Sequence, residues 1–145
     1  MKIQNLLKES QKKLKKSIND SYQLDSEILM SKILHKKREF ILLNLEKEVD
    51  IQKSNIFINL VNQRSQGKPI AYLLGKKDFW KYEFDVSKDV LIPRPDTELI
   101  IEKVLDLTKH KSKLNILDIG VGSGCILLSI LKEKPHFNGT GVDLS

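Results

Sequence analysis

The sequence predicts an α+β chain made of a small N-terminal helical bundle, a β-hairpin linker and one strand–helix–strand unit. Three observations predict it. Residues 1–66 contain neither Gly nor Pro, the two residues that interrupt helices most strongly. The segment after them is rich in Gly, Pro and aromatic residues. Residues 114–145 then follow the pattern of a buried strand, a glycine-rich turn, a helix and a second strand. We expect three domains, at residues 1–66, 67–95 and 96–145.

The first domain is expected to hold four or five short helices. Apolar residues recur there at helical spacing, and the lysines between residues 12 and 16 fall largely off the first apolar stripe. The expected core-facing sets are Ile3, Leu6, Leu7, Leu14 and Ile18; Leu24, Ile28, Ser31 and Leu34; Phe40 to Leu45; and Ile56, Phe57, Leu60 and Val61.

The second domain is expected to be a hairpin followed by a stiff loop. Tyr82, Phe84 and Val86 alternate with charged residues, which is the period of a strand with one buried face. We expect the hairpin to run from about residue 77 to residue 92, with residues 90–92 in its second half. Trp80 is expected to anchor the hairpin in the core rather than to contact a substrate.

The loop Ile-Pro-Arg-Pro at residues 92–95 is expected to hold Arg94 on a defined backbone, because Pro93 and Pro95 fix their own φ angles and push the residues before them towards extended conformations. Asp96 stands where a helix N-cap is expected. The helix that follows is expected to end near His110, with its apolar stripe on Leu99, Ile100, Val104 and Leu107.

The last part is expected to be a βαβ unit. Leu114, Ile116, Leu117 and Ile119 form the apolar run of a buried parallel strand, residues 126–131 form a helix, and residues 139–142 start a second strand. One such unit cannot cover both faces of a parallel sheet.

The turn of this unit has the pattern Asp-x-Gly-x-Gly-x-Gly. Glycines allow backbone to approach a ligand closely, and the free N–H groups of the following helix point at whatever binds there. Asp143 ends the next strand, where an acid accepts hydrogen bonds from ribose hydroxyls in nucleotide-binding folds. A dinucleotide fingerprint needs glycine at position 125, which is Cys125. The pattern instead resembles motif I of class I S-adenosylmethionine-dependent methyltransferases; the alternative is a tight turn that binds nothing.

Three further segments carry a more specific resemblance. They are GKPIAYLLG at residues 67–75, Phe-Trp at 79–80 and LIPRPDTE at 91–98. With the glycine turn, they resemble the protein-(glutamine-N5) methyltransferases of the HemK/PrmC family, in the family's order and over essentially the whole chain. One departure is Asp96, where the family usually has Glu.

The resemblance implies a helical domain that binds class I peptide chain release factors and a Rossmann-like domain that binds S-adenosyl-L-methionine. The implied reaction methylates the glutamine amide of the factor's Gly-Gly-Gln motif, a step of translation termination. The cofactor-binding residues would be Asp118, Gly120, Val121, Gly122, Ser123, Gly124 and Asp143, and the residues lining the cleft would be Pro93, Arg94 and Thr97. For Asp118, the open alternatives are the cofactor's ammonium group and a backbone amide of the turn.

The family's catalytic Asn-Pro-Pro-Tyr motif does not occur in these 145 residues. We therefore expect an N-terminal fragment, without catalytic residues of its own and without methyltransferase activity on its own. Two rival functions stay open. One is amino-methylation of a nucleic acid base, and the other is a non-catalytic module that binds a release factor or the ribosome.

Charge and composition limit the kinds of partner, metal site and cellular compartment that we expect. Residues 1–66 carry 13 Lys and Arg against 8 Asp and Glu, which gives five of the six net positive charges of the chain. This favours either an anionic partner or a lysine-rich solvated surface; the lack of interleaved aromatic residues makes direct nucleic-acid binding a poor match. The single cysteine and the widely spaced His35, His110 and His136 exclude a disulfide framework and predict no metal site. No apolar run is long enough for a membrane span, so we expect a cytoplasmic monomer.

Overall fold

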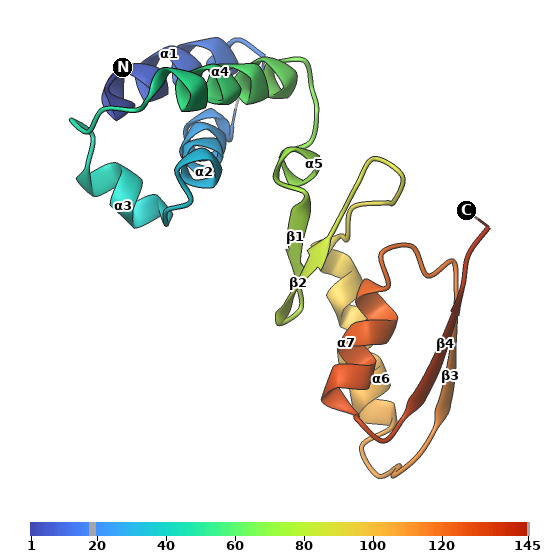
Figure 1. The fold of residues 1–145 in the computed structure, drawn as a ribbon. Helices are drawn as coiled ribbons and strands as arrows, with labels where there is room; N and C mark the ends of the chain where they lie inside the picture. Colours follow the sequence, from blue (N-terminus) through green and yellow to red (C-terminus); the bar gives the residue numbers. More distant parts are fainter. Residues whose placement is uncertain (18–19, 145) are drawn as a thin grey trace. The chain divides into compact units, whose positions relative to one another are not determined.

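The computed structural model of the chain describes residues 1–17 and 20–144 (Figure 1). The chain divides into two compact units, Met1–Leu74 and Gly75–Ser145. Helices come first, followed by a two-stranded hairpin and two parallel strands, so the α+β class is confirmed. Ile18, which the sequence places on the first apolar stripe, lies outside the described residues.

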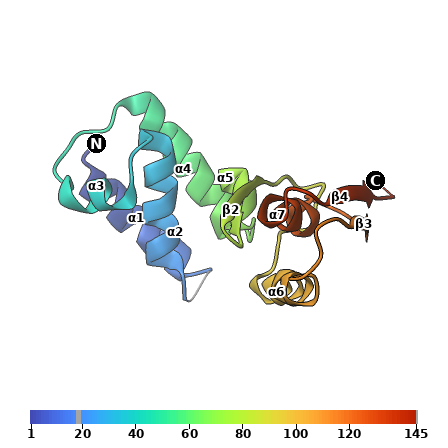
Figure 2. The same cartoon turned by 90° about the horizontal axis from the view of Figure 1, so that it is seen from below.

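The first unit is built from helices. They are α1 (Ile3–Lys15), α2 (Tyr22–Leu34), α3 (Arg38–Leu43), α4 (Ile51–Ser65) and the short α5 (Ile70–Leu74). Helices α1, α2 and α4 pack against one another, and α3 contacts α2 (Figure 2). Helix α5 contacts α2 and α4, so this unit reaches eight residues beyond position 66.

The apolar stripe of α1 is confirmed, because Ile3, Leu6, Leu7 and Leu14 are all buried in one core. The expected face of α2 is wrong. Leu24 is exposed, and the side that faces the core carries Asp25, Ser26, Leu29, Met30 and Ile33. Three polar side chains of this helix, Asp25, Ser26 and Glu27, are buried. An apolar count from the sequence therefore selects a neighbouring face.

The other two expected sets of this unit are only partly buried. In α3, Ile41 is fully buried, while Leu42 and Leu43 are exposed. In α4, Phe57 and Val61 are buried as expected, whereas Ile56 is exposed. The unit therefore shows apolar side chains on its surface that its own core does not use.

The hairpin of the second unit is shorter than expected. Strand β1 (Lys76–Phe79) pairs antiparallel with β2 (Tyr82–Asp85), so residues 90–92 are not its second half. Phe79 pairs with Tyr82, which leaves Trp80 and Lys81 as a two-residue connection with Trp80 at φ +58°. Phe79 is the fully buried anchor, and Trp80 packs half-buried against the same core.

The loop after the hairpin leads into a 3₁₀ turn at Pro95–Thr97 and then into α6 (Glu98–Leu107). Asp96 lies inside the 3₁₀ turn, so its prediction as the N-cap is wrong. Three positions of the stripe expected on α6 are wrong, since Leu99, Ile100 and Leu107 are exposed; Val104 packs against the core as expected, and Ile101 is fully buried. The helix ends at Leu107, before His110.

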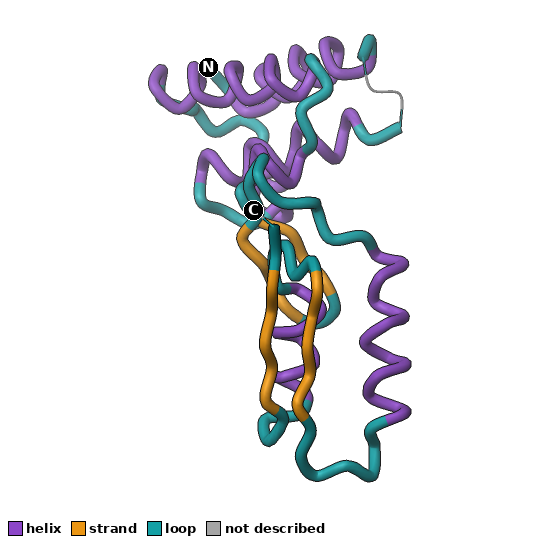
Figure 3. Tube along the Cα trace, turned by 90° about the vertical axis from the view of Figure 1, so that its right-hand side faces the viewer, coloured by secondary structure: helices purple, strands orange, loops and turns teal. Residues whose placement is uncertain are grey.

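The βαβ unit is confirmed. Strands β3 (Asn115–Ile119) and β4 (Asn138–Val142) run parallel, joined through α7 (Cys125–Glu133) (Figure 3). Helix α7 contacts β4 and α6, and its Cys125 and Ile130 share a core with Phe79 and Ile101. The helix therefore covers one face of the strand pair.

The other face of β3 and β4 is exposed in the described part of the chain. Leu117 and Ile119 point to it, and Ile119 is 78% exposed. Val142, the pairing partner of Ile119, is exposed too. The strand is thus where the sequence predicts it, but only one of its two faces is covered by helices, as expected for a single βαβ unit.

Candidate cofactor-binding site

The glycine-rich turn, residues 118–124, connects the end of β3 to the start of α7. Gly120, Gly122 and Gly124 all have left-handed backbone angles, with φ of +80°, +51° and +74°. Residues other than glycine rarely adopt left-handed backbone angles. At Gly124 an added Cβ would also lie 3.1 Å from a methyl carbon of Leu128. The turn therefore requires glycine at each of these positions, as the sequence predicts.

Backbone hydrogen bonds attach the turn to the end of β4. The N–H groups of Gly120 and Val121 both donate to the Val142 carbonyl oxygen, at 2.8 and 3.1 Å. Within the turn, the Gly124 N–H donates to the Val121 carbonyl at 2.8 Å. The conformation of the turn is therefore fixed by the parallel strand beside it.

The carboxylate of Asp143 completes this attachment. Its Oδ2 atom accepts a hydrogen bond from the Gly122 N–H at 2.8 Å, and its Oδ1 atom accepts one from the Leu144 N–H at 2.8 Å. The structure thus brings together the acid and the turn that the sequence predicts to share a site.

The N-terminus of α7 opens onto this turn. The first helical hydrogen bond runs from the Leu128 N–H to the Gly124 carbonyl at 2.9 Å, so the N–H groups of Cys125, Ile126 and Leu127 precede it. No side chain caps this helix end. The partial positive charge of the helix N-terminus adds to these donors, which suits a polar or anionic group.

Asp118 lies on the helix-covered side of β3, beside Gly141 of β4. Its half-buried carboxylate makes no hydrogen bond or ion pair with a described residue. Of the two alternatives for Asp118, the bond to a backbone amide of the turn is therefore absent from the described structure. Its role towards a cofactor stays a prediction.

Two glycines of β4 also shape the site, and the sequence analysis missed them. A Cβ on Gly141 would lie 2.7 Å from a methyl carbon of Val121, and one on Gly139 would lie 2.8 Å from methyl carbons of Leu127 and Leu131. Glycine in a strand interior often marks such close approach. Two glycines in the short segment Gly-Thr-Gly at residues 139–141 could have indicated this close approach from the sequence.

Ser123 is half-buried at the end of a groove that runs between β2 and α7. Phe84 and Leu128 are among the apolar side chains along this groove, and its volume is about 970 Å³. The groove therefore leads from the hairpin to the glycine turn.

The three residues expected to line a cleft differ in exposure. Pro93 is buried, Thr97 is half-buried and Arg94 is exposed. Arg94 has extended backbone angles (φ −99°, ψ 139°), as predicted from its two flanking prolines. Its guanidinium makes no hydrogen bond or ion pair with any described residue. Whether these residues face a cofactor or a substrate stays a prediction.

Two glutamates fix the hairpin connection to the helices of its unit. The Trp80 N–H donates to Glu98 Oε1 at 2.9 Å, and the Trp80 indole N–H donates to Glu133 Oε1 at 3.0 Å. Lys81 forms an ion pair with Glu133 at 2.8 Å. The Tyr82 hydroxyl donates to the same Glu133 oxygen at 3.3 Å. Neither glutamate was singled out from the sequence, because their partners are distant along the chain.

These contacts shift three pKa values. The hydrogen bonds from Lys81 and Trp80 lower the pKa of Glu133. The bond to Glu133 raises the pKa of Lys81. Partial desolvation, followed by the nearby Glu133 charge, raises the pKa of Tyr82. All three shifts favour the protonation states present near neutral pH.

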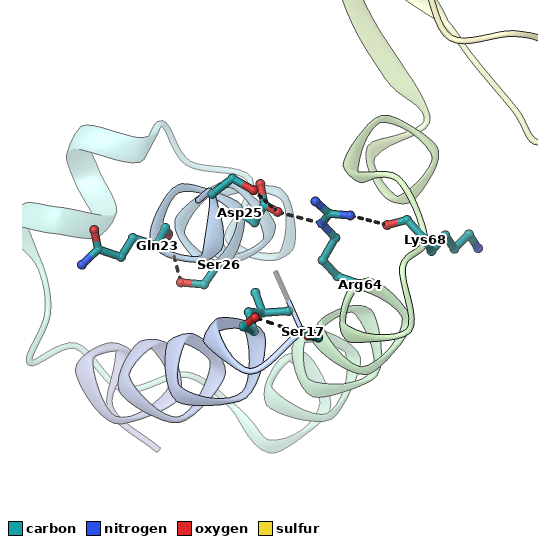
Figure 4. A network of polar contacts seen from close by, with 8 residues as sticks. Ser17, Gln23, Asp25, Ser26, Arg64 and Lys68 are labelled. Atoms are coloured by element: carbon teal, nitrogen blue, oxygen red, sulfur yellow. Dashed lines mark hydrogen bonds and ion pairs between the residues drawn. The ribbon is translucent and has the colours of Figure 1, made fainter. Parts of the chain in front are cut away.

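A second polar network lies inside the helical unit (Figure 4). The Arg64 guanidinium at the end of α4 donates to Asp25 of α2 at 2.7 Å and to the Lys68 carbonyl at 3.1 Å. Ser21 also donates to Asp25, at 3.0 Å. The side chains of Asp25 and Arg64 are 5% and 15% exposed. This pair explains why a charged residue faces the core on α2.

The remaining candidates are surface or packing residues. Cys125 is buried in the core, and His35, His110 and His136 are exposed. Among the described residues, no group of three or more His, Cys, Asp and Glu side chains is arranged to hold a metal ion. In the same part of the chain, no helix is both long enough and apolar enough to cross a membrane.

Comparison with known proteins confirms the resemblance that the motifs indicate. Residues 5–75 match the PrmC N-terminal domain family. The chain is 41% identical over 145 residues to the release factor glutamine methyltransferase of Buchnera aphidicola subsp. Schizaphis graminum, which covers 100% of this chain and 52% of that relative.

Two other relatives carry the same name. The protein of Aliivibrio fischeri is 40% identical over 143 residues, covering 99% of this chain and 50% of the relative. The protein of Clostridium botulinum is 39% identical over 130 residues, which covers 90% of this chain and 46% of that relative. The chain thus spans about half the length of the curated relatives it matches.

Proposed function

Starting from the membership of residues 5–75 in the PrmC N-terminal domain family, we propose that this chain takes part in the methylation of class I peptide chain release factors. The helical unit recognises the factor, and the glycine turn binds S-adenosyl-L-methionine. The methyl group goes to the side-chain nitrogen of the glutamine in the Gly-Gly-Gln motif. Translation termination takes place in the cytoplasm, which is the setting that this proposal implies.

The observation that carries the cofactor assignment is the glycine turn fixed by Asp143. Three left-handed glycines leave the backbone uncovered beside the α7 N-terminus, and the space around a Cβ at Gly120 or Gly122 is open. Asp143 places a carboxylate at the end of β4, beside the turn, and Asp118 has a carboxylate without a protein partner in the described chain. These groups fit the ribose and the ammonium group of S-adenosylmethionine respectively.

The chemistry explains what this chain contributes. The bound sulfonium supplies an activated methyl group, and the glutamine amide is a weak nucleophile because its lone pair is delocalised. Alignment of the two groups therefore supplies much of the catalysis. The residues of this chain hold the methyl donor on the turn and the protein acceptor on the helical unit, which brings both reactants into one complex.

Two binding measurements on the chain test this proposal. Calorimetric titration with S-adenosylmethionine is expected to give one-to-one binding, and Gly122→Val is expected to abolish it because valine does not tolerate φ of +51°. Titration with a class I release factor is expected to give a complex. Absence of cofactor binding by the wild-type chain would refute the cofactor assignment, and binding of an RNA or DNA duplex in place of the release factor would favour the nucleic-acid alternative.

A further inference from the structure

The helical unit contains an open groove beside Phe40. It lies between the end of α2, helix α3 and the segment that leads into α4, and its volume is about 500 Å³. We call it the Phe40 groove. Its lining comprises Leu34, Lys36, Phe40, Lys47, Val49 and Lys53, together with Glu48 and Asp50.

The edge of the Phe40 groove is apolar. Leu43 follows Phe40 by three residues in α3, so the two side chains lie on one face of the helix. Leu43 is 84% exposed, and Leu42 and Leu45 beside it are exposed as well. Leu43 therefore places an exposed apolar side chain beside Phe40, outside the lining itself, and the exposed leucines before and after it in sequence favour this part of the helical unit as an interaction surface.

The Phe40 groove is also positively charged. The ammonium groups of Lys36 and Lys47 lie 5.5 and 5.2 Å from the centre of the Phe40 ring, and neither forms an ion pair with a described residue. Of the two acids in the lining, Asp50 caps α4 by accepting from the Lys53 N–H at 2.8 Å. Its carboxylate also pairs with Lys53 at 3.7 Å, so Lys36 and Lys47 stand against the exposed Glu48 alone, and the lining keeps a net positive charge for carboxylates of a partner.

We propose that the Phe40 groove docks an apolar side chain of a protein partner, flanked by carboxylates that pair with Lys36 and Lys47. This inference rests on the proposed function, and the partner is then the class I release factor. A nucleic acid fits less well. Its phosphates would use the lysines, but contact with phosphate leaves the exposed leucines unused.

The test measures release-factor affinity for two groove variants and two matched controls. Leu43→Ser removes the apolar edge, and Ile56→Ser makes the same kind of change at an exposed position of α4 outside the groove. The double variant Lys36→Glu, Lys47→Glu reverses the groove charge, and Lys8→Glu, Lys12→Glu makes the same net change on exposed α1 residues. Circular dichroism verifies that each variant keeps its helices.

Each groove variant is expected to weaken binding about tenfold, the loss of roughly one well-placed contact, while each control changes affinity about twofold or less. The effect of the charge-reversal variant is expected to shrink at high salt. A photo-crosslinking residue at position 43 should mark a release-factor peptide that contains an apolar residue next to Asp or Glu.

Three results would overturn the inference. Groove variants that bind like their controls would remove the groove from the interface, and the proposed function would stand. A crosslink to a peptide without acidic residues would refute the charge pairing. If the wild-type chain fails to bind a release factor at all, the proposed function itself falls, and this inference falls with it.

Discussion

At the scale of single residues, Asp143 links the turn to the end of β4, because its carboxylate accepts the Gly122 N–H. Asp143→Ala is expected to weaken S-adenosylmethionine binding by roughly tenfold or more. A hydrogen bond to a charged group contributes about 1.5–3 kcal/mol, and both the turn and the ligand would lose one. Calorimetry measures the affinity, and hydrogen exchange at the Gly122 amide should become faster.

The matched control for this substitution is Asp106→Ala. Asp106 belongs to an exposed ion pair with Lys109 on α6, where truncation costs little. Unchanged cofactor affinity in the Asp143 variant, alongside an unchanged control, would remove Asp143 from the site.

Two arginine–carboxylate ion pairs of the helical unit differ in how exposed the arginine is, and this difference gives a second prediction. Arg64→Met leaves the Asp25 carboxylate in the core without its cation, and the free energy of unfolding is expected to fall by about 3 kcal/mol. Arg38→Met breaks the pair between α3 and Glu27 of α2. Glu27 is 11% exposed, but Arg38 is 50% exposed and water reaches the pair, so the expected loss is smaller, about 1–2 kcal/mol. Urea unfolding followed by circular dichroism measures both, and equal losses would contradict the assigned difference in burial.

Some site residues were predictable from the sequence and others were not. Residues 118–124 are consecutive, and Asp143 follows from the geometry of one βαβ crossover, so a local pattern was sufficient to find them. Asp25 and Glu133 depend on partners 39 and about 50 residues away in sequence. The spacing of apolar residues within one helix or strand does not predict contacts between residues so far apart in sequence.

At the scale of elements, Glu133 fixes the hairpin connection to the end of α7. Glu133→Gln is expected to lower the thermal midpoint at neutral pH, because the ion pair with Lys81 is lost and the bonds from Trp80 and Tyr82 lose their charged acceptor. Glu102→Gln, at an exposed position of α6, is the matched control and is expected to leave the midpoint nearly unchanged.

The pH dependence of stability tests the same element. The pKa of Glu133 is lower in the folded state than in the unfolded state, so its stabilisation is complete above the ordinary glutamate pKa and is lost as pH falls through the lowered value. The raised pKa values of Lys81 and Tyr82 act at the other end, where stabilisation is lost as pH rises through them. In thermal melts across pH, Glu133→Gln should flatten the acidic side of the curve; an unchanged acidic side would contradict the role of Glu133.

The order and type of elements were predictable, but the faces of two helices and the end of the hairpin were not. Helical period selects a face correctly when core positions are apolar, as in α1. In α2 the pair between Asp25 and Arg64 places a charge inward. In α6 three apolar residues, Leu99, Ile100 and Leu107, are exposed, so an apolar count does not separate them from those that pack in the core.

At the scale of the whole molecule, the described residues form a hydrophobic core in each of the two units. Residues 1–74 are therefore expected to fold without the rest. A unit of this size has marginal stability, so a broad unfolding transition at low urea is expected. The measurement is far-UV circular dichroism of the expressed segment, and a random-coil spectrum would contradict independent folding.

The composition change at Gly67 indicated a helical first part, whereas the compact unit ends at Leu74. The difference arises because α5 follows Gly67 and Pro69 but contacts α2 and α4. A glycine and a proline mark the end of one helix, while tertiary packing decides which residues belong to the unit.

The most direct test of the proposed function is methyl transfer by a chimera. Residues 1–145 of this chain replace the 145 aligned residues of the Buchnera relative, to which they are 41% identical. After incubation with S-adenosylmethionine and a class I release factor, mass spectrometry of the peptide with the Gly-Gly-Gln motif reports the product. We predict one methyl group on that glutamine, and slower methylation at limiting S-adenosylmethionine when the chimera carries Asp143→Ala. An unmodified glutamine from a folded chimera, under conditions in which the unaltered relative methylates it, would contradict the account.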